Sequence, residues 1–355
     1  MLKPFLLYFK GTLIASGLGL MIAAGIGFYS SGELSGALHA LFICLILGIL
    51  ETSLSFDNAV INATVLKQMS PVWQRRFLTW GMIIAVFGMR LIFPVMIVAV
   101  IGKMGPIEAL QLALLKPLEY AQMMLSAEHE ISAFGGAFLL LVSLKYFFDQ
   151  EKTLHWIRFI EKPLFKLGKL EALEFAITIV VILLISQTIP SSERNGFLYS
   201  GLAGVLSFLC LEGVNLLFRK SSKKPARNSS ELSKKDIHRA SLGLFLYLEI
   251  LDASFSFDGV IGAFAITPNL FIIAIGLGIG ALFVRSLTIM MVEKGSLNTF
   301  VFLEHGAFYA LGALAIIMFL NVLTQVPEVV SGLIGAFFIS LATWSSIRHK
   351  RLLQS

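Results

Sequence analysis

The chain has 355 residues, of which 57% are hydrophobic and only 14% charged, and its formal net charge is +6. Soluble domains carry roughly 25% charged residues, so this composition excludes an ordinary soluble protein. Because helices satisfy their own backbone hydrogen bonds in lipid, the recurring apolar runs predict an all-α polytopic membrane protein. The basic residues lie mostly in loops between these runs, which favours lipid headgroups over nucleic acid as their partners.

The apolar runs predict ten transmembrane helices. They cover residues 5–28, 36–66, 77–102, 131–148, 172–190, 197–218, 240–267, 270–292, 300–323 and 329–347. A signal peptide is the alternative for 5–28, but its length and Lys10 favour a retained helix. Residues 103–130 mix charged and apolar side chains, which indicates an amphipathic or re-entrant segment.

The distribution of basic residues predicts the orientation. With the N-terminus inside, only Lys103, Lys116 and Arg194 among the loop Lys and Arg residues fall outside, as the positive-inside rule requires. We therefore expect both termini in the cytoplasm, in a bacterial cytoplasmic membrane. Two domains are predicted, a first transmembrane repeat at 1–196 and a second at 197–355, and the second contains a basic cytoplasmic loop at 219–239.

An acidic motif occurs twice and suggests a duplication. Glu51 precedes Asp57 by six residues, and Asp252 precedes Asp258 by the same number. Further matching landmarks follow in the same order, namely Arg90 with Arg285, and Glu128-His129 with Glu304-His305. The first copy enters the membrane from outside and the second from the cytoplasm. This pattern predicts two inverted repeats with a substrate site near the midplane.

The acids within predicted spans indicate a site for a cation or a proton. They are Glu51, Asp57, Glu249, Asp252 and Asp258. A central Asp costs on the order of 3 kcal/mol on insertion scales, so a decorative role is excluded. The alternative is a network that only locks helices together, but two arginines cannot neutralise five acids.

Helix geometry restricts how these groups meet. Six residues of straight helix rise about 9 Å and turn about 240°, so Glu51 and Asp57 cannot ligate one ion from a regular helix. Either the Ser55–Asp57 segment is unwound or ligands converge from both repeats. Asn58 and Asn62 share a face and add neutral oxygen ligands, and Glu249 shares a face with Asp252.

The ligand chemistry favours a hard divalent cation. Oxygen ligands suit Mg²⁺, Ca²⁺ or Mn²⁺, and a histidine would tilt the choice toward Mn²⁺. The pairs Glu128-His129 and Glu304-His305 are placed at helix ends, where a gating role and ordinary helix capping are both open.

At these residues the chain resembles the TerC family, named for tellurium resistance, in the LysE-type transporter superfamily. It is most similar to the long integral-membrane subgroup of uncharacterised "DUF" type. The resemblance lies in Glu51-x-x-Leu54-Ser55-x-Asp57-Asn58-Ala59, in the second copy around Asp252 and Asp258, and in Arg90 and Arg285. It implies a divalent-metal exporter, with Mn²⁺ most often linked to relatives, and a site lined by Glu51, Asp57, Asn58, Asp252 and Asp258. Gly259 replaces Asn58 in the second copy, so the two halves differ.

We therefore expect a non-enzymatic transporter that exports a divalent cation, Mn²⁺ first and Ca²⁺ or Mg²⁺ next. Its expected partners are the lipid bilayer and the metal ion, and a homo-oligomer is compatible with the sequence. The alternatives are a LysE-type amino-acid exporter, a membrane scaffold and an intramembrane hydrolase. A hydrolase could share a proton between paired aspartates, but the Gly-x-Gly-Asp and Tyr-Asp pattern of membrane aspartyl proteases does not occur.

Overall fold

The computed structural model describes residues 2–354 apart from 171, 223–233 and 325, with only the backbone for some helical residues, Asp258 among them. Every regular element in this described part is a helix, and eight helices are long and apolar enough to cross a membrane. They are Leu7–Ser31, Leu34–Leu54, Pro71–Ile101, Glu128–Phe148, Ser191–Gly213, Leu270–Glu293, Leu303–Asn321 and Val330–Leu352. The predicted all-α polytopic membrane protein is confirmed, with a lipid bilayer as its environment.

The described part of the chain has eight such helices, against ten predicted spans, and two helices account for the difference. Helix α10 (Leu173–Ser186) has 14 residues, a rise of about 21 Å against a hydrocarbon core of about 30 Å. Helix α12 (Lys234–Ile266) has 33 residues and is long enough. It is not counted among the eight because the side chains of several of its residues, Asp258 among them, lie outside the described part of the chain.

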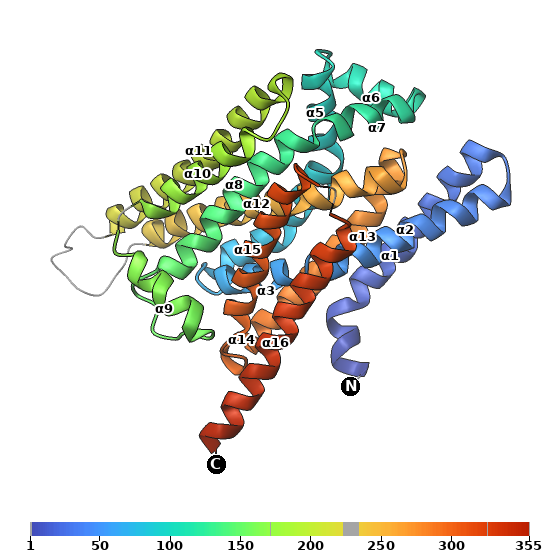
Figure 1. Ribbon diagram of the computed structural model, residues 1–355. Helices are drawn as coiled ribbons and strands as arrows, with labels where there is room; N and C mark the ends of the chain where they lie inside the picture. Colours follow the sequence, from blue (N-terminus) through green and yellow to red (C-terminus); the bar gives the residue numbers. More distant parts are fainter. Residues whose placement is uncertain (1, 171, 223–233, 325, 355) are drawn as a thin grey trace.

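Helices α1 (Leu2–Ser31) and α2 (Leu34–Leu54) form a hairpin at one side of the bundle (Figure 1). Gly32 makes the turn with a φ of 71°, a left-handed conformation that glycine adopts without strain. Apolar side chains such as Leu13 and Ile14 are exposed on α1, as expected for a lipid-facing helix. Thr12 Oγ1 lies 2.7 Å from Ser286 Oγ and tethers α1 to α13 (Leu270–Glu293).

The second predicted helix is two helices in the structure. Helix α2 ends at Leu54, and α3 (Phe56–Leu66) begins after a single residue, Ser55. The 36–66 prediction therefore has the right length but misses this break in its middle.

The third span, Pro71–Ile101, contains two π-helical stretches. Its parts are α4 (Pro71–Arg76), η1 (Phe77–Gly81), η2 (Ile84–Ile92) and α5 (Phe93–Ile101). π-Helical turns are rare and frequently accompany functional sites. In this span they carry Leu78, Gly81 and Arg90.

The segment predicted as amphipathic or re-entrant forms two short helices at one end of the bundle (Figure 1). Helices α6 (Pro106–Leu115) and α7 (Pro117–Ser126) each begin with proline, which has no backbone donor to lose there. Ala109, Tyr120 and Met124 are buried against the bundle, while the charged side chains of these helices face outward.

The centre of the bundle is α8 (Glu128–Phe148), the most buried of the candidate spans. It packs against α11 (Ser191–Ser222), α12 and α15. The amphipathic α9 (Arg158–Leu167) follows α8. The predicted boundary between residues 196 and 197 falls inside α11, and most of the predicted loop at 219–239 is in the undescribed range 223–233.

The C-terminal part consists of α13 (Leu270–Glu293), α14 (Ser296–Thr299), α15 (Leu303–Asn321) and α16 (Glu328–Gln354). Asn269 caps α13, accepting hydrogen bonds from the backbone N–H groups of Phe271 and Ile272. The two ends of the chain lie on the same side of the bundle, together with α9 and α14 (Figure 1).

Helix α13 approaches α2 so closely that only glycine fits at the contact. A Cβ at Gly280 would lie 2.4 Å from Cβ and Cγ of Glu51, and one at Gly276 would lie 2.7 Å from Leu47 Cβ. Small residues allow this approach between membrane helices. This contact fixes the position of Glu51 along the bundle relative to α13.

We predict that Gly280→Ala separates α13 from α2 and lowers the free energy of unfolding by about 1–3 kcal/mol, the usual cost of overpacking. The measurement is thermal unfolding of the purified protein in detergent. Gly17→Ala is the control, because a Cβ at Gly17 would meet nothing within 4 Å. Equal midpoints for the two variants would show that the helices are not held at this distance.

Candidate functional site

The site is built on the break at Ser55. Ser55 has φ −99° and ψ 19°, outside the helical region, and its backbone N–H still donates to Glu51 O at the end of α2. Thr52 Oγ1 donates to Gly48 O and Ser53 Oγ donates to Ile49 O, and this competition for backbone acceptors weakens the helix locally. The break gives α3 its own N-terminus, so Asp57 stands in a first helical turn where a negative charge is stabilised.

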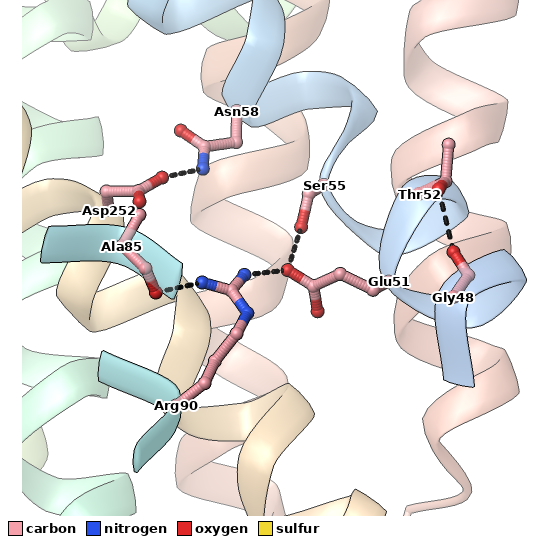
Figure 2. A network of polar contacts seen from close by, with 8 residues as sticks. All are labelled: Gly48, Glu51, Thr52, Ser55, Asn58, Ala85, Arg90 and Asp252. Carbon is pink, nitrogen blue, oxygen red and sulfur yellow. Dashed lines mark hydrogen bonds and ion pairs between the residues drawn. The ribbon is translucent and has the colours of Figure 1, made fainter. Parts of the chain in front are cut away.

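A buried ion pair lies beside the break. Arg90 Nη2 donates to Glu51 Oε1, and both side chains are about 97% buried, with exposures of 3% and 4% (Figure 2). Ser55 Oγ donates to the same Oε1 atom at 3.2 Å, and Arg90 Nη1 donates to the carbonyl of Ala85. The π-helical stretch η2 thus anchors the guanidinium at one end and delivers it to the carboxylate at the other.

A hydrogen bond joins the two copies of the acidic motif. Asn58 Nδ2 on α3 donates to Asp252 Oδ1 on α12 (Figure 2), and the Asn62 amide also interacts with this carboxylate. The carbonyl oxygens of Asn58 and Asn62 are buried and accept no hydrogen bond from the described residues. Two orphaned oxygen acceptors beside a carboxylate form a set that a cation would satisfy.

These groups line one small cavity, which we call the Asn58–Asp252 cavity. It has a volume of about 40 Å³. Its polar lining comes from Glu51, Ser55, Asn58, Asn62, Arg90, Asp252, Arg285 and Thr288. Since about 10–15 Å³ holds one water, this space fits a few waters or a partly hydrated ion.

Asp57 faces a different cavity, although it is next to Asn58 in the chain. Successive residues on a helix point about 100° apart, which separates the two side chains. The Asp57 cavity has a volume of about 20 Å³ and is lined by Asp57, Ser331 and Gly335, together with Glu51 and Ser55. Glu51 and Ser55 therefore form the wall between the two cavities.

The remaining predicted site acids are placed as follows. Glu249 Oε1 is buried without a hydrogen-bond partner and lies against Gly81 of η1. Asp258 lies on α12, with its side chain outside the described residues, directly before Gly259 in the lining of the Asp57 cavity. Helix α12 continues unbroken through this second copy, unlike the first.

The two predicted arginines differ in their contacts. Arg90 pairs with Glu51, whereas Arg285 has no ion pair within the described part of the chain, and its Nε is buried without a partner. Both line the Asn58–Asp252 cavity. No three His, Cys, Asp or Glu side chains among the described residues gather as a preformed metal site. An ion in this cavity would therefore use amide oxygens and water beside Asp252.

The predicted Glu-His pairs lie away from these cavities. His129 Nδ1 is 2.8 Å from Glu193 Oε2, and His305 Nε2 is 2.9 Å from the carbonyl of Leu154. Glu128 and Glu304 stand in the first turns of α8 and α15, where an acid complements the helix dipole.

Sequence reasoning missed Glu161, the most buried acid outside the spans among the described residues. Its Oε1 accepts hydrogen bonds from the N–H groups of Trp156 and Ile157, and its Oε2 lies 3.1 Å from Lys152 Nζ. Burial lowers the pKa of Lys152, and the Glu161 carboxylate opposes this shift. The available signal was that Glu161 is the only acid between residues 152 and 170.

The fold and this site define a polytopic helical membrane protein with a charged, hydrogen-bonded centre between its helices. Residues 56–353 match the model of the family described as "Protein of unknown function (DUF475)", so the chain belongs to this family. No curated protein and no solved structure matches the chain.

The resemblance to the TerC family and the LysE-type superfamily is therefore wrong, because the matching family is DUF475 and not TerC. The quoted motif is short and consists of acids, small residues and an amide. Such groups recur wherever a membrane protein buries a polar site, so they do not identify one family.

We predict that Arg90→Gln lowers the free energy of unfolding by about 3–5 kcal/mol, because it leaves the Glu51 carboxylate buried without its partner. The double variant Glu51→Gln/Arg90→Gln should recover much of this loss. Denaturant unfolding of the purified protein measures both. Arg285→Gln is the matched control, since it breaks no ion pair among the described residues. A loss as large for Arg285→Gln as for Arg90→Gln would contradict this account.

Proposed function

We propose that the protein exports a divalent cation, Mn²⁺ first and Ca²⁺ or Mg²⁺ next, through the Asn58–Asp252 cavity. The observation that carries the proposal is the pair of buried, unsatisfied carbonyl oxygens of Asn58 and Asn62 beside the Asp252 carboxylate. Carbonyl and carboxylate oxygens with a few waters are the ligands that these hard cations prefer.

The charges around the cavity suggest how its carboxylates are neutralised when no cation is bound. Glu51, Asp252, Arg90 and Arg285 line it together, two acids and two bases. In this arrangement the guanidinium groups balance the carboxylates without a metal. A divalent cation would take over this role, and the guanidinium of Arg90 would have to leave Glu51 as the cation passes.

The ten spans and two inverted repeats remain part of the proposal. Helices α10 and α12 would add two crossings to the eight. Corresponding residues of the two halves, Glu51 with Asp252 and Arg90 with Arg285, line the same cavity. This is the arrangement expected when a pseudo-two-fold axis passes through the site.

The proposed location is a bacterial cytoplasmic membrane with both termini inside. The common side of the two chain ends and the clustering of Lys and Arg in loops of one side support this orientation. Export would then run from the side of α9 and α14 to the side of α6 and α7.

A second candidate substrate is an amino acid, because the guanidinium of Arg285, which has no ion pair among the described residues, could hold a carboxylate. The cavity volume of about 40 Å³ argues against a substrate of this size. A hydrolase is less favoured, since Asp57 and Asp252 line different cavities and do not form a dyad. A scaffold would not require unsatisfied oxygens around an internal space.

We predict that purified protein in liposomes carries Mn²⁺ and that Asp252→Asn reduces the flux at least tenfold, because the carboxylate charge is lost while its shape is kept. Quenching of an entrapped metal-sensitive dye measures the flux. Glu119→Gln, which changes an exposed acid on α7, should transport at the unsubstituted rate. Transport by Asp252→Asn at that rate would rule out this site.

We also predict that Mn²⁺ raises the midpoint of thermal unfolding. A ligand at one hundred times its Kd adds about 2.7 kcal/mol to the free energy of unfolding. Asn58→Ala should weaken the effect, because it removes an oxygen ligand, and free lysine should cause no shift. Stabilisation by lysine but not by Mn²⁺, Ca²⁺ or Mg²⁺ would favour the amino-acid exporter. If none of these ligands shifts the midpoint, the scaffold would be favoured.

A further inference from the structure

A third cavity lies next to the Asn58–Asp252 cavity, toward the side of the chain termini. This Gln74 cavity has a volume of about 70 Å³ and is lined by Leu66, Gln74, Leu78, Ile289, Val292 and Glu293. Glu293 is the last residue of α13 and is exposed, and the next residue, Lys294, lies over the Tyr8 ring near the start of α1. The cavity thus stands at the end of the bundle, with a carboxylate at its mouth.

Leu78 lines both this cavity and the Asn58–Asp252 cavity. Helix α13 runs along both as well, with Ala281, Arg285 and Thr288 on one and Ile289 and Val292 on the other. The two spaces are therefore neighbours along one helix, with Leu78 as the side chain between them. Beyond them, Glu51 and Ser55 divide the Asn58–Asp252 cavity from the Asp57 cavity.

The three cavities follow one another, and the two side chains that separate them differ in polarity. An apolar side chain, Leu78, separates the first from the second, and the ion-paired Glu51 separates the second from the third. Apolar constrictions can gate by excluding water. Leu78 lies on the π-helical stretch η1, a type of turn found frequently at functional sites.

We propose that Leu78 is the access gate between the Glu293 mouth and the Asn58–Asp252 cavity, so that a small cation passes it to reach Asp252. The inference rests on the proposed function for what passes the gate, a divalent cation. Leu78 itself touches no ligand and controls access alone. The role of Leu78 as a gate does not require that the ion is transported, so it can be tested separately.

The test measures the reaction of a small cation, Ag⁺, with single thiols in protein whose own free cysteines, Cys44 and Cys210, are replaced by alanine. Val292→Cys places a thiol in the Gln74 cavity and Ala281→Cys places one in the Asn58–Asp252 cavity, both on α13. The readout is loss of subsequent maleimide labelling after denaturation. We expect Leu78→Trp to slow the Ala281→Cys reaction at least tenfold and to leave that of Val292→Cys unchanged.

Leu78→Ala should speed the Ala281→Cys reaction severalfold, which keeps the test decisive if the tryptophan variant fails to fold. An Ala281→Cys rate that responds to neither Leu78 variant overturns the gate. Liposomes that carry no Mn²⁺, combined with rates that follow the size of residue 78, would refute the proposed function and leave the gate standing. Mn²⁺ transport combined with Ala281→Cys reaction rates that do not depend on residue 78 would support the proposed function and refute the gate.

Discussion

The ion pair of Arg90 with Glu51 is the interaction on which the centre of this protein depends. An unpaired charge inside a membrane bundle is strongly unfavourable, so each partner determines where the other can stand. The pair holds the π-helical part of the third span against the end of α2, where Gly280 allows α13 to approach. Three helices are thereby fixed around one carboxylate. The Asn58–Asp252 cavity exists because these helices meet at charged groups, which leave space that apolar side chains would fill.

The break at Ser55 determines which cavity each of the polar side chains lines. Without it, Glu51 and Asp57 would follow one regular helix and face unrelated directions. With it, Glu51 stands in a wall between two cavities, Asp57 lines one of them, and Asn58 reaches Asp252 across the other. The second copy of the motif has no break, so α12 contributes Asp252 from an intact helix. An asymmetric centre of this kind presents different groups to an ion at successive positions, which suits passage better than tight storage.

The sequence predicted the all-α membrane fold because hydrophobic runs report burial in lipid directly. It also indicated a helix break or converging ligands near Ser55, from the geometry of a six-residue spacing. The structure shows a break at Ser55 and a hydrogen bond from Asn58 to Asp252. It could not assign partners, since whether Arg90 or Arg285 meets Glu51 depends on helix packing that no spacing reveals.

Glu161 was missed because a single acid in a basic loop resembles a solvated residue until tertiary structure buries it. The number of spans was harder to predict, because hydrophobic runs do not show that α10 has only 14 residues. The family was assigned wrongly because a short motif of buried polar residues does not identify one family.

The central claim is that a divalent cation occupies the space between Asn58, Asn62 and Asp252. The most direct measurement is an anomalous difference map from crystals grown with Mn²⁺, recorded above and below the manganese absorption edge. The account predicts a peak in the Asn58–Asp252 cavity, within coordination distance of the Asp252 carboxylate and at least one of the two amide oxygens. A map with no peak there, or with manganese only at surface carboxylates, would contradict it.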